Sequence, residues 1–154
     1  KAETNFVLCI DSDGQCDPLD FKNFWNNKDK LQDNYFLIGN RINRKDGFFR
    51  YIISKLFKAY HKILFKNDLS DPSCPYVFFN KKDFYPIKDH LNYMQEGFWW
   101  GFVGSCLLRK IKFFEININH RKRIEGNTNV YKINKIPMIA IRNAVGLFKL
   151  RFFL

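Results

Sequence analysis

The sequence predicts an α/β fold, because short apolar segments of strand length alternate with longer segments that have the periodicity of helices. The chain has 154 residues, which fits one domain with a buried core. Hydrophobic residues make up 46% of it and aromatic residues 18%, which argues against a disordered chain. We expect a mixed sheet flanked by helices, with a basic amphipathic helix at the carboxyl end.

Four strands are expected in short runs rich in strand-forming residues: residues 6–10, 35–39, 76–79 and 113–118. Five helical segments lie between or after these strands: residues 18–26, 48–66, 82–94, 97–110 and 131–154. Three polar segments are expected to be loops: residues 40–47, 67–75 and 119–130.

Two of the helices carry clear local signals. Asp17 stands where an N-cap is expected, with Pro18 at the first helical position, and Phe21, Phe24 and Trp25 would form the buried stripe that follows. In segment 48–66, apolar residues recur at the i, i+3, i+4, i+7 spacing of a helix. The other face of that helix is basic: Arg50, Lys55, Lys58, Lys62 and Lys66.

The segment directly after the first expected strand is rich in oxygen ligands. Asp11, Asp13 and Gln15 stand at alternate positions there. In open α/β sheets, ligands bind outside the carboxyl ends of the strands. Oxygen ligands suit a hard divalent cation, Mg²⁺ or Mn²⁺, that also holds phosphates. The alternative is an Asp-rich turn before a helix, because Asp, Ser and Gly all favour turns.

Charge and cysteine usage narrow the classes of ligand. The net charge of +11 favours an anionic partner: a phosphorylated ligand, an anionic membrane surface or nucleic acid. The four cysteines form no Cys-x-x-Cys pair and the three histidines are scattered, so the spacing of zinc ligands is absent and reduced, structural thiols are expected. No segment has the about 18 nearly uncharged apolar residues that define a transmembrane helix.

Five motifs follow one another along the chain: Asp-Ser-Asp-Gly-Gln-Cys-Asp-Pro at 11–18, Gly-Asn-Arg at 39–41, Arg-Tyr-Ile-Ile-Ser at 50–54, Asp-Pro-Ser at 71–73, and Glu115, Arg123, Gly126 and Thr128 within 115–128. In order and spacing they resemble the family 2 glycosyltransferases, inverting enzymes of GT-A fold. They look most like the polyprenyl-phosphate (dolichol-phosphate mannosyltransferase-like) branch. The resemblance runs from residue 1 to about residue 150.

The resemblance implies a partial GT-A (Rossmann-like) mixed sheet. Residues 1–130 would be the carboxyl-terminal part of the catalytic domain, and residues 131–154 a basic amphipathic helical tail. The nucleotide-binding βα units of the family would precede residue 1, so this chain alone is expected to be incomplete and inactive.

The resemblance also assigns a donor site. Asp11, Asp13 and Gln15 would bind the Mg²⁺ or Mn²⁺ ion and the donor diphosphate, and Arg123 would close over that diphosphate from a loop. Asp13 and Arg123 are thus the expected catalytic residues. The alternative for Arg123 is a solvated basic loop, the commoner fate of a run such as residues 120–123.

For the acceptor, the resemblance implies that Arg41, Arg50 and Ser54 cradle the phosphate of a polyprenyl phosphate. Arg50 and Ser54 are four residues apart near a helix start, where an anion is favoured. The alternative is a solvated basic helix face. Asp71 would lie in a loop beside the active site, or simply start a turn before Pro72.

The sequence departs from the family in two places. Gly101 stands where relatives often carry an acidic residue, and Thr128-Asn129 replaces the commoner Ser-Lys. Transfer to a phosphate needs no catalytic base, because a phosphate monoester has a second pKa of about 6 and is mostly dianionic at pH 7.

These features predict a metal-dependent inverting glycosyltransferase that moves a hexose from UDP- or GDP-hexose to a polyprenyl phosphate. It would lie peripherally on the anionic cytoplasmic face of a membrane, with its basic, aromatic helices on the surface. One alternative is transfer to a hydroxyl of a glycan acceptor. Another is a non-enzymatic module that binds nucleic acid, suggested by the charge and the interleaved aromatic residues; under the first hypothesis no nucleic-acid partner is expected.

Overall fold

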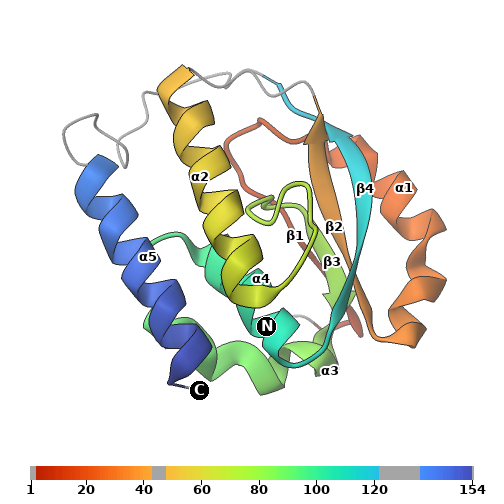
Figure 1. Ribbon diagram of the computed structural model, residues 1–154. Coiled ribbons are helices and arrows are strands. Elements are labelled where there is room, and N and C mark those ends of the chain that lie inside the picture. The colour runs from red at the N-terminus through yellow and green to blue at the C-terminus, as the bar shows by residue number, and fades with distance from the viewer. Residues whose placement is uncertain (1–2, 43–47, 122–135, 154) are drawn as a thin grey trace.

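The computed structural model describes residues 3–42, 48–121 and 136–153, with the side chains of residues 48–50 outside that set. A four-stranded mixed sheet forms its centre (Figure 1). The strands are β1 (Phe6–Cys9), β2 (Tyr35–Ile42), β3 (Val77–Asn80) and β4 (Lys112–Asn119), in the spatial order β1-β3-β2-β4. All four expected strands and the mixed α/β class are confirmed.

The strand directions bring three carboxyl ends to one edge of the sheet. β3 is antiparallel to both β1 and β2, whereas β2 and β4 are parallel over eight residue pairs, from Tyr35–Lys112 to Ile42–Asn119. β1, β2 and β4 therefore point the same way. The segments that follow them leave from the same edge, where a ligand site of an α/β sheet is expected.

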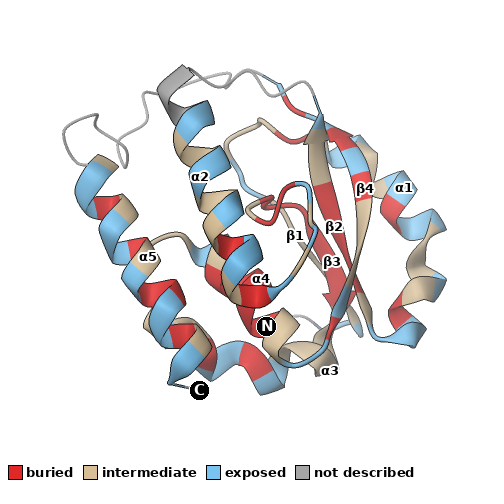
Figure 2. Ribbon diagram, viewed as in Figure 1, coloured by how far each residue is buried: buried red, intermediate tan, exposed pale blue. Residues whose placement is uncertain are grey.

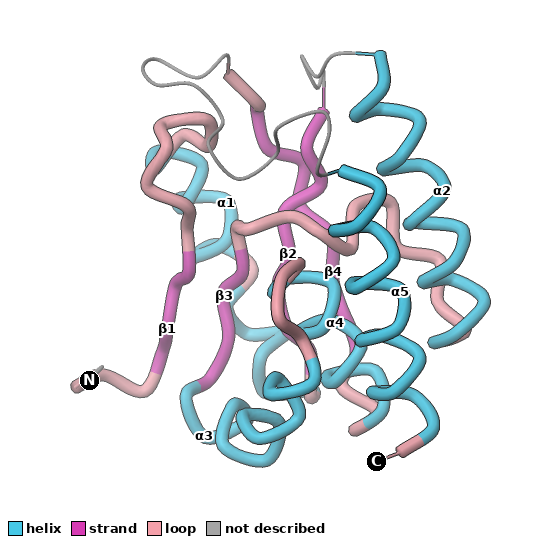
Figure 3. Tube along the Cα trace, turned by 90° about the vertical axis from the view of Figure 1, so that its left-hand side faces the viewer, coloured by secondary structure: helices cyan, strands magenta, loops and turns pink. Residues whose placement is uncertain are grey.

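Helices cover both faces of the sheet (Figures 1 and 3). The α-helices are α1 (Phe21–Asn26), α2 (Phe48–Phe65), α3 (Lys81–Phe84), α4 (Phe98–Leu108) and α5 (Ile136–Phe152). Shorter 3₁₀ turns precede and follow α1, at Pro18–Asp20 and Lys28–Asp33, and a longer one, Tyr85–Tyr93, continues α3. The expected helix at 82–94 is thus confirmed as mostly 3₁₀.

Two neighbouring residues of β3 show why both faces are apolar. The ring of Phe78 lies 5.3 Å from that of Phe21 in α1, and the ring of Phe79 lies 5.7 Å from that of Phe102 in α4. Successive strand residues point to opposite faces, so each ring packs against a different helix layer. Both are almost fully buried.

A second apolar cluster joins α2 and α5 to α4. Phe65, Leu147 and Leu150 are its buried members. Two hydrogen bonds also tie α2 to α5: the Tyr60 hydroxyl donates to the Ala144 carbonyl, and Arg151 Nε donates to the Leu64 carbonyl, each at 2.9 Å. The two long helices therefore form one packed unit on one side of the sheet.

Some sequence expectations need correction. Trp25 was expected in a buried stripe but is 44% exposed; its ring contacts those of Phe6 and Phe78 in the sheet, and the rest of it faces solvent. Asn40, Arg41 and Ile42 were expected in a loop but continue β2, because they pair with β4. The expected loops 43–47 and 122–130 lie outside the described residues. None of the helices described is long and apolar enough to cross a membrane.

Candidate functional site

The loop that carries Asp11, Asp13 and Gln15 runs from the end of β1 to the helical turn at Pro18. Gly14 takes a positive φ of 73°, which a residue with a side chain rarely adopts. One carboxylate oxygen of Asp13 accepts a hydrogen bond from the Gln15 backbone N–H at 3.1 Å. As expected, the Asp17 side chain caps the next turn by accepting from the Leu19 N–H. Local bonds therefore fix the path of this loop.

The end of β4 holds the other side of the same loop. The Arg121 N–H donates to the Gln15 carbonyl at 2.8 Å, and Cys16 forms an isolated bridge with His120. The Arg121 guanidinium also pairs with the Asp17 carboxylate. The chain thus leaves β4 beside the Asp loop; Arg123 lies outside the described residues.

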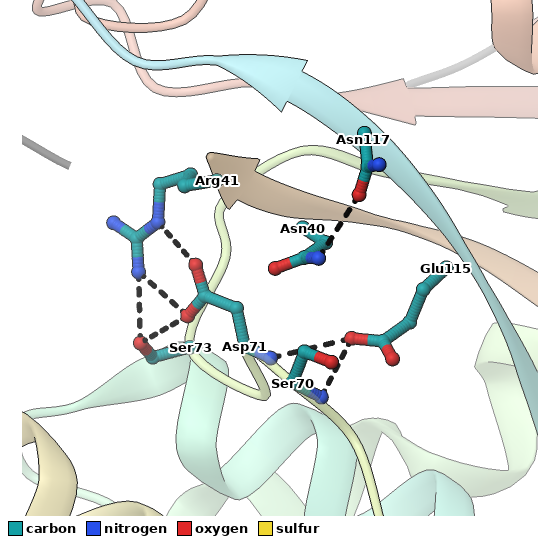
Figure 4. Close-up of polar contacts among 7 residues, drawn as sticks. All are labelled: Asn40, Arg41, Ser70, Asp71, Ser73, Glu115 and Asn117. Carbon is teal, nitrogen blue, oxygen red and sulfur yellow. Dashed lines mark hydrogen bonds and ion pairs between the residues drawn. The ribbon is translucent and has the colours of Figure 1, made fainter. Parts of the chain in front are cut away.

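Arg41, at the end of β2, forms a bidentate ion pair with Asp71 (Figure 4). Arg41 Nε lies 2.5 Å from Asp71 Oδ2, and its terminal nitrogen lies 2.8 Å from Oδ1. The Ser73 hydroxyl donates to Asp71 Oδ1 at 3.1 Å and accepts from Arg41 at 2.9 Å. The side chains of Arg41 and Asp71 are only 12% and 5% exposed. The pair therefore holds both side chains in one orientation.

Glu115 of β4 holds the loop that carries Asp71. Its Oε1 accepts hydrogen bonds from the backbone N–H groups of Ser70, at 2.7 Å, and of Asp71, at 3.3 Å (Figure 4). Nearby, Asn40 donates to Asn117 across the parallel pair at 3.0 Å. Both contacts join β4 to residues at the end of β2 or in the 67–75 loop.

The pKa of the Cys16 thiol is affected by charges from the Asp loop and from the Arg41–Asp71 pair. Burial raises its pKa to about 11; the Arg41 charge lowers that pKa, whereas the Asp13, Asp11 and Asp71 charges raise it. The three carboxylates and the guanidinium are therefore close enough to act on one buried atom. Burial likewise raises the pKa of Cys74, with a further contribution from Asp71. Both thiols stay protonated near pH 7, which fits the expected structural role.

The oxygen ligands of the loop fit a divalent cation that is shared with a ligand. In the part of the chain that the structure describes, no three His, Cys, Asp or Glu side chains form a metal site on their own. Asp11 and Asp13 supply two carboxylates from an exposed and a half-buried position. Mg²⁺ is commonly held by one or two carboxylates together with substrate phosphates and water. The residues present therefore suit such a cation.

Of the two predicted phosphate-binding residues in α2, the structure describes the side chain of only one. Ser54 lies half-buried in the second turn of α2, and the side chain of Arg50 lies outside the described residues. The structure groups Arg41 with Asp71 and Ser73. The proposed phosphate cradle of Arg41, Arg50 and Ser54 stays a prediction.

Sequence reasoning did not assign roles to Glu115, Ser73 or the Asn40–Asn117 pair. No local signal marked the asparagine pair, because Asn40 and Asn117 meet only through the parallel register of β2 and β4. At Gly101, an added Cβ would lie 2.2 Å from Met94 Cγ, so an acidic side chain does not fit there as Met94 is now placed.

Comparisons with known proteins place this chain in no family: it matches no protein-family model, no curated protein and no solved structure.

Proposed function

We propose that this protein is part of a metal-dependent inverting glycosyltransferase that moves a hexose from a nucleotide sugar to a polyprenyl phosphate. One observation carries the proposal. Asp11, Asp13, Arg41 and Asp71 come from three of the motifs that resemble family 2 glycosyltransferases. The Asp loop leaves the end of β1, and Arg41, at the end of β2, which runs the same way, binds Asp71. Residues far apart in the sequence are thus gathered at one edge of the sheet.

The Asp loop would bind the donor. Asp11, Asp13 and Gln15 would hold Mg²⁺ or Mn²⁺ together with the diphosphate of a UDP- or GDP-hexose. When bound, such a cation neutralises the charge that develops on the departing diphosphate. The resemblance gives Arg123 the same electrostatic role. Arg121, two residues before it in the sequence, lies beside the loop, where its N–H donates to the Gln15 carbonyl.

The state of Asp71 favours a phosphate acceptor over a hydroxyl acceptor. A hydroxyl needs a carboxylate base within hydrogen-bond reach, whereas a phosphate dianion attacks without losing a proton. Asp71 is almost buried, and both of its oxygens already accept hydrogen bonds from Arg41 or Ser73. It is therefore suited to orient Arg41 rather than to take a proton.

The proposed fold is part of a GT-A fold. The four-stranded mixed sheet with helices on both faces is compatible with part of a GT-A fold, in which residues 1–130 belong to the catalytic domain and residues 131–154 form the tail. The protein would work peripherally at the cytoplasmic face of a membrane, where its lipid acceptor is found.

Two substitutions test the proposal in the full-length gene product. Asp13→Asn should abolish transfer of labelled hexose to polyprenyl phosphate, whereas Asp29→Asn, at an exposed carboxylate after α1, should leave transfer unchanged. Arg50→Ala should strongly reduce the rate of hexose transfer to the lipid phosphate. Full activity of Asp13→Asn would contradict the proposal, and transfer to a soluble glycan that survives Arg50→Ala would favour the hydroxyl acceptor.

A further inference from the structure

The outer side of the α2–α5 pair carries an unusual density of exposed apolar side chains. Among the described residues, ten of the fifteen exposed large hydrophobic residues belong to α2, α5 or the residue after α5. They include Ile63 of α2, whose side chain is 75% exposed. Leu56 of α2 and Ile141 of α5 are each 65% exposed. Scattered single apolar residues are normal on a surface, but ten on two helices packed together indicate an interaction surface.

The same surface is basic and lacks acidic residues. α2 and α5 together comprise 35 residues, with seven Lys or Arg and no Asp or Glu. On the exposed side of α2, Lys55 lies with its ammonium group 4.6 Å from the centre of the Tyr51 ring. On α5, the exposed cations are Arg142 and Lys149. Apolar groups interleaved with cations complement a surface that is apolar below and anionic above.

The packing of the two helices makes this a fixed surface. The Tyr60–Ala144 and Arg151–Leu64 hydrogen bonds hold α2 against α5, and both helices bury their inner sides against α4. Figure 2 shows exposed residues along both helices, on the side of the molecule away from α1. The apolar residues therefore cannot turn inwards without breaking that packing.

We propose that the outer side of the α2–α5 pair is a membrane-binding face that lies on an anionic lipid bilayer. Its exposed apolar residues would enter the boundary between headgroups and acyl chains, and its lysines and arginines would contact lipid phosphates. Most of the exposed apolar side chains are aliphatic, among them Leu56, Ile63, Met138 and Ile141. Aliphatic groups cannot stack on bases, so the face suits lipid better than nucleic acid.

The face also adjoins the candidate site. α2 and α5 both begin at the end of the molecule where β2 and β4 finish (Figure 1). A lipid headgroup bound beside α2 would thus lie near the edge that carries the Asp loop. This last link rests on the proposed function, whereas binding to lipid does not.

Vesicle co-sedimentation tests the face without any sugar transfer. The chain is mixed with vesicles of phosphatidylcholine alone or of phosphatidylcholine with phosphatidylglycerol, and the bound fraction is measured. The wild-type protein should bind the anionic vesicles more tightly. The double variant Leu56→Glu/Ile141→Glu should lose at least about tenfold in partition, because two apolar contacts are replaced by anions.

Two further variants make the test specific. Leu19→Glu changes an apolar side chain that is 82% exposed next to α1, on the other side of the sheet, and should bind like the wild type. Arg142→Gln/Lys149→Gln should weaken binding to anionic vesicles about fivefold for each lost cation and leave binding to neutral vesicles unchanged. Circular dichroism checks that each variant keeps its helices.

Three results would overturn the inference. One is equal vesicle binding by the wild type and the Leu56→Glu/Ile141→Glu variant. Another is equal loss in the Leu19→Glu variant. The third is an oligomer that is dissolved by Leu56→Glu/Ile141→Glu while the wild type binds no vesicles, which would make the face a contact between copies of this chain.

Discussion

The Arg41–Asp71 pair places two opposite charges where water reaches them poorly. Each charge is tolerated there because the other neutralises it through two hydrogen bonds. The sequence suggested a functional role for each residue but not their contact. They are 30 positions apart, and only the pairing of β2 with its neighbours brings the 67–75 loop to the end of β2.

Asp71→Asn should lower the free energy of unfolding by about 3 kcal/mol, because it leaves the Arg41 charge nearly buried without its counter-ion. Urea denaturation measures this loss. The matched control is Asp68→Asn, which breaks the exposed Lys62–Asp68 pair and should leave stability unchanged within error. Equal effects of the two substitutions would show that the Arg41–Asp71 pair is not buried in solution.

His61 provides a pH-dependent test of the α2–α4 packing. It is fully buried in α2, with Nε2 at 3.2 Å from the Trp100 carbonyl and Nδ1 at 3.1 Å from the Asn67 side-chain nitrogen. Because a carbonyl only accepts, Nε2 carries the proton of a neutral ring. Burial lowers the pKa of His61 from its ordinary value of 6.5 to about 4, although the Trp100 hydrogen bond opposes the shift.

The unfolded chain therefore binds a proton at His61 between pH 6.5 and 4 that the folded chain does not bind. The stability linked to this group is complete above pH 6.5 and should fall by about 3 kcal/mol as the pH is lowered towards 4. Denaturant unfolding at several pH values measures the slope. In His61→Gln the total loss of stability over this pH range should be smaller by about 3 kcal/mol. An identical loss would mean that His61 is accessible to protons in the folded state.

At the scale of elements, the sequence predicted every described strand because each has an apolar core rich in strand formers. It placed the end of β2 too early, because Asn40 and Arg41 are polar and continue the strand only through pairing with β4. Periodicity likewise found α2 but could not show that Leu56 and Ile63 are exposed. The burial of a residue in α2 depends on which helices pack beside it, and the local sequence pattern does not predict those neighbours.

Gly146 lets α5 approach Tyr93 and Met94 closely. A Cβ at this position would lie 2.9 Å from the Tyr93 carbonyl oxygen and 3.0 Å from Met94 Sδ. Gly146→Ala should therefore destabilise the protein by about 1–3 kcal/mol, although alanine normally stabilises a helix relative to glycine. Thermal unfolding measures the change.

The control for Gly146→Ala is Ala59→Gly, on the exposed side of α2, which should cost only the intrinsic helix propensity, about 1 kcal/mol. A more stable Gly146→Ala variant would show that α5 does not pack closely against the Tyr93–Met94 backbone.

At the scale of the whole molecule, the described surface has two distinct regions. The edge formed by the ends of β1, β2 and β4 gathers carboxylates around an Asp-rich loop. The outer side of the α2–α5 pair is apolar and cationic without any acidic residue. Under the proposed function the cationic face would bind an anionic lipid, and a cation at the Asp loop would let acidic residues bind the diphosphate of the sugar donor.

The residues of the candidate site could be named from the sequence because their motifs are local. Asp11, Asp13 and Gln15 follow a strand core directly, and the Asp17 cap follows from its place before Pro18. The contacts of Glu115 with the Asp71 loop were not visible, because they depend on the parallel register of β2 and β4. The sequence therefore predicted a local feature such as the Asp17 cap, but not the contacts between segments far apart in the chain.

Sugar transfer by the full-length gene product tests the central claim most directly. The protein is incubated with Mn²⁺, a short polyprenyl phosphate and a panel of labelled nucleotide sugars, and the label in the organic phase is counted with and without EDTA. We predict label from one donor, loss of that label in EDTA and its recovery when excess Mn²⁺ is added back. Lipid-linked label that is unaffected by EDTA, or no transfer from any donor to lipid phosphate, would contradict the proposed function.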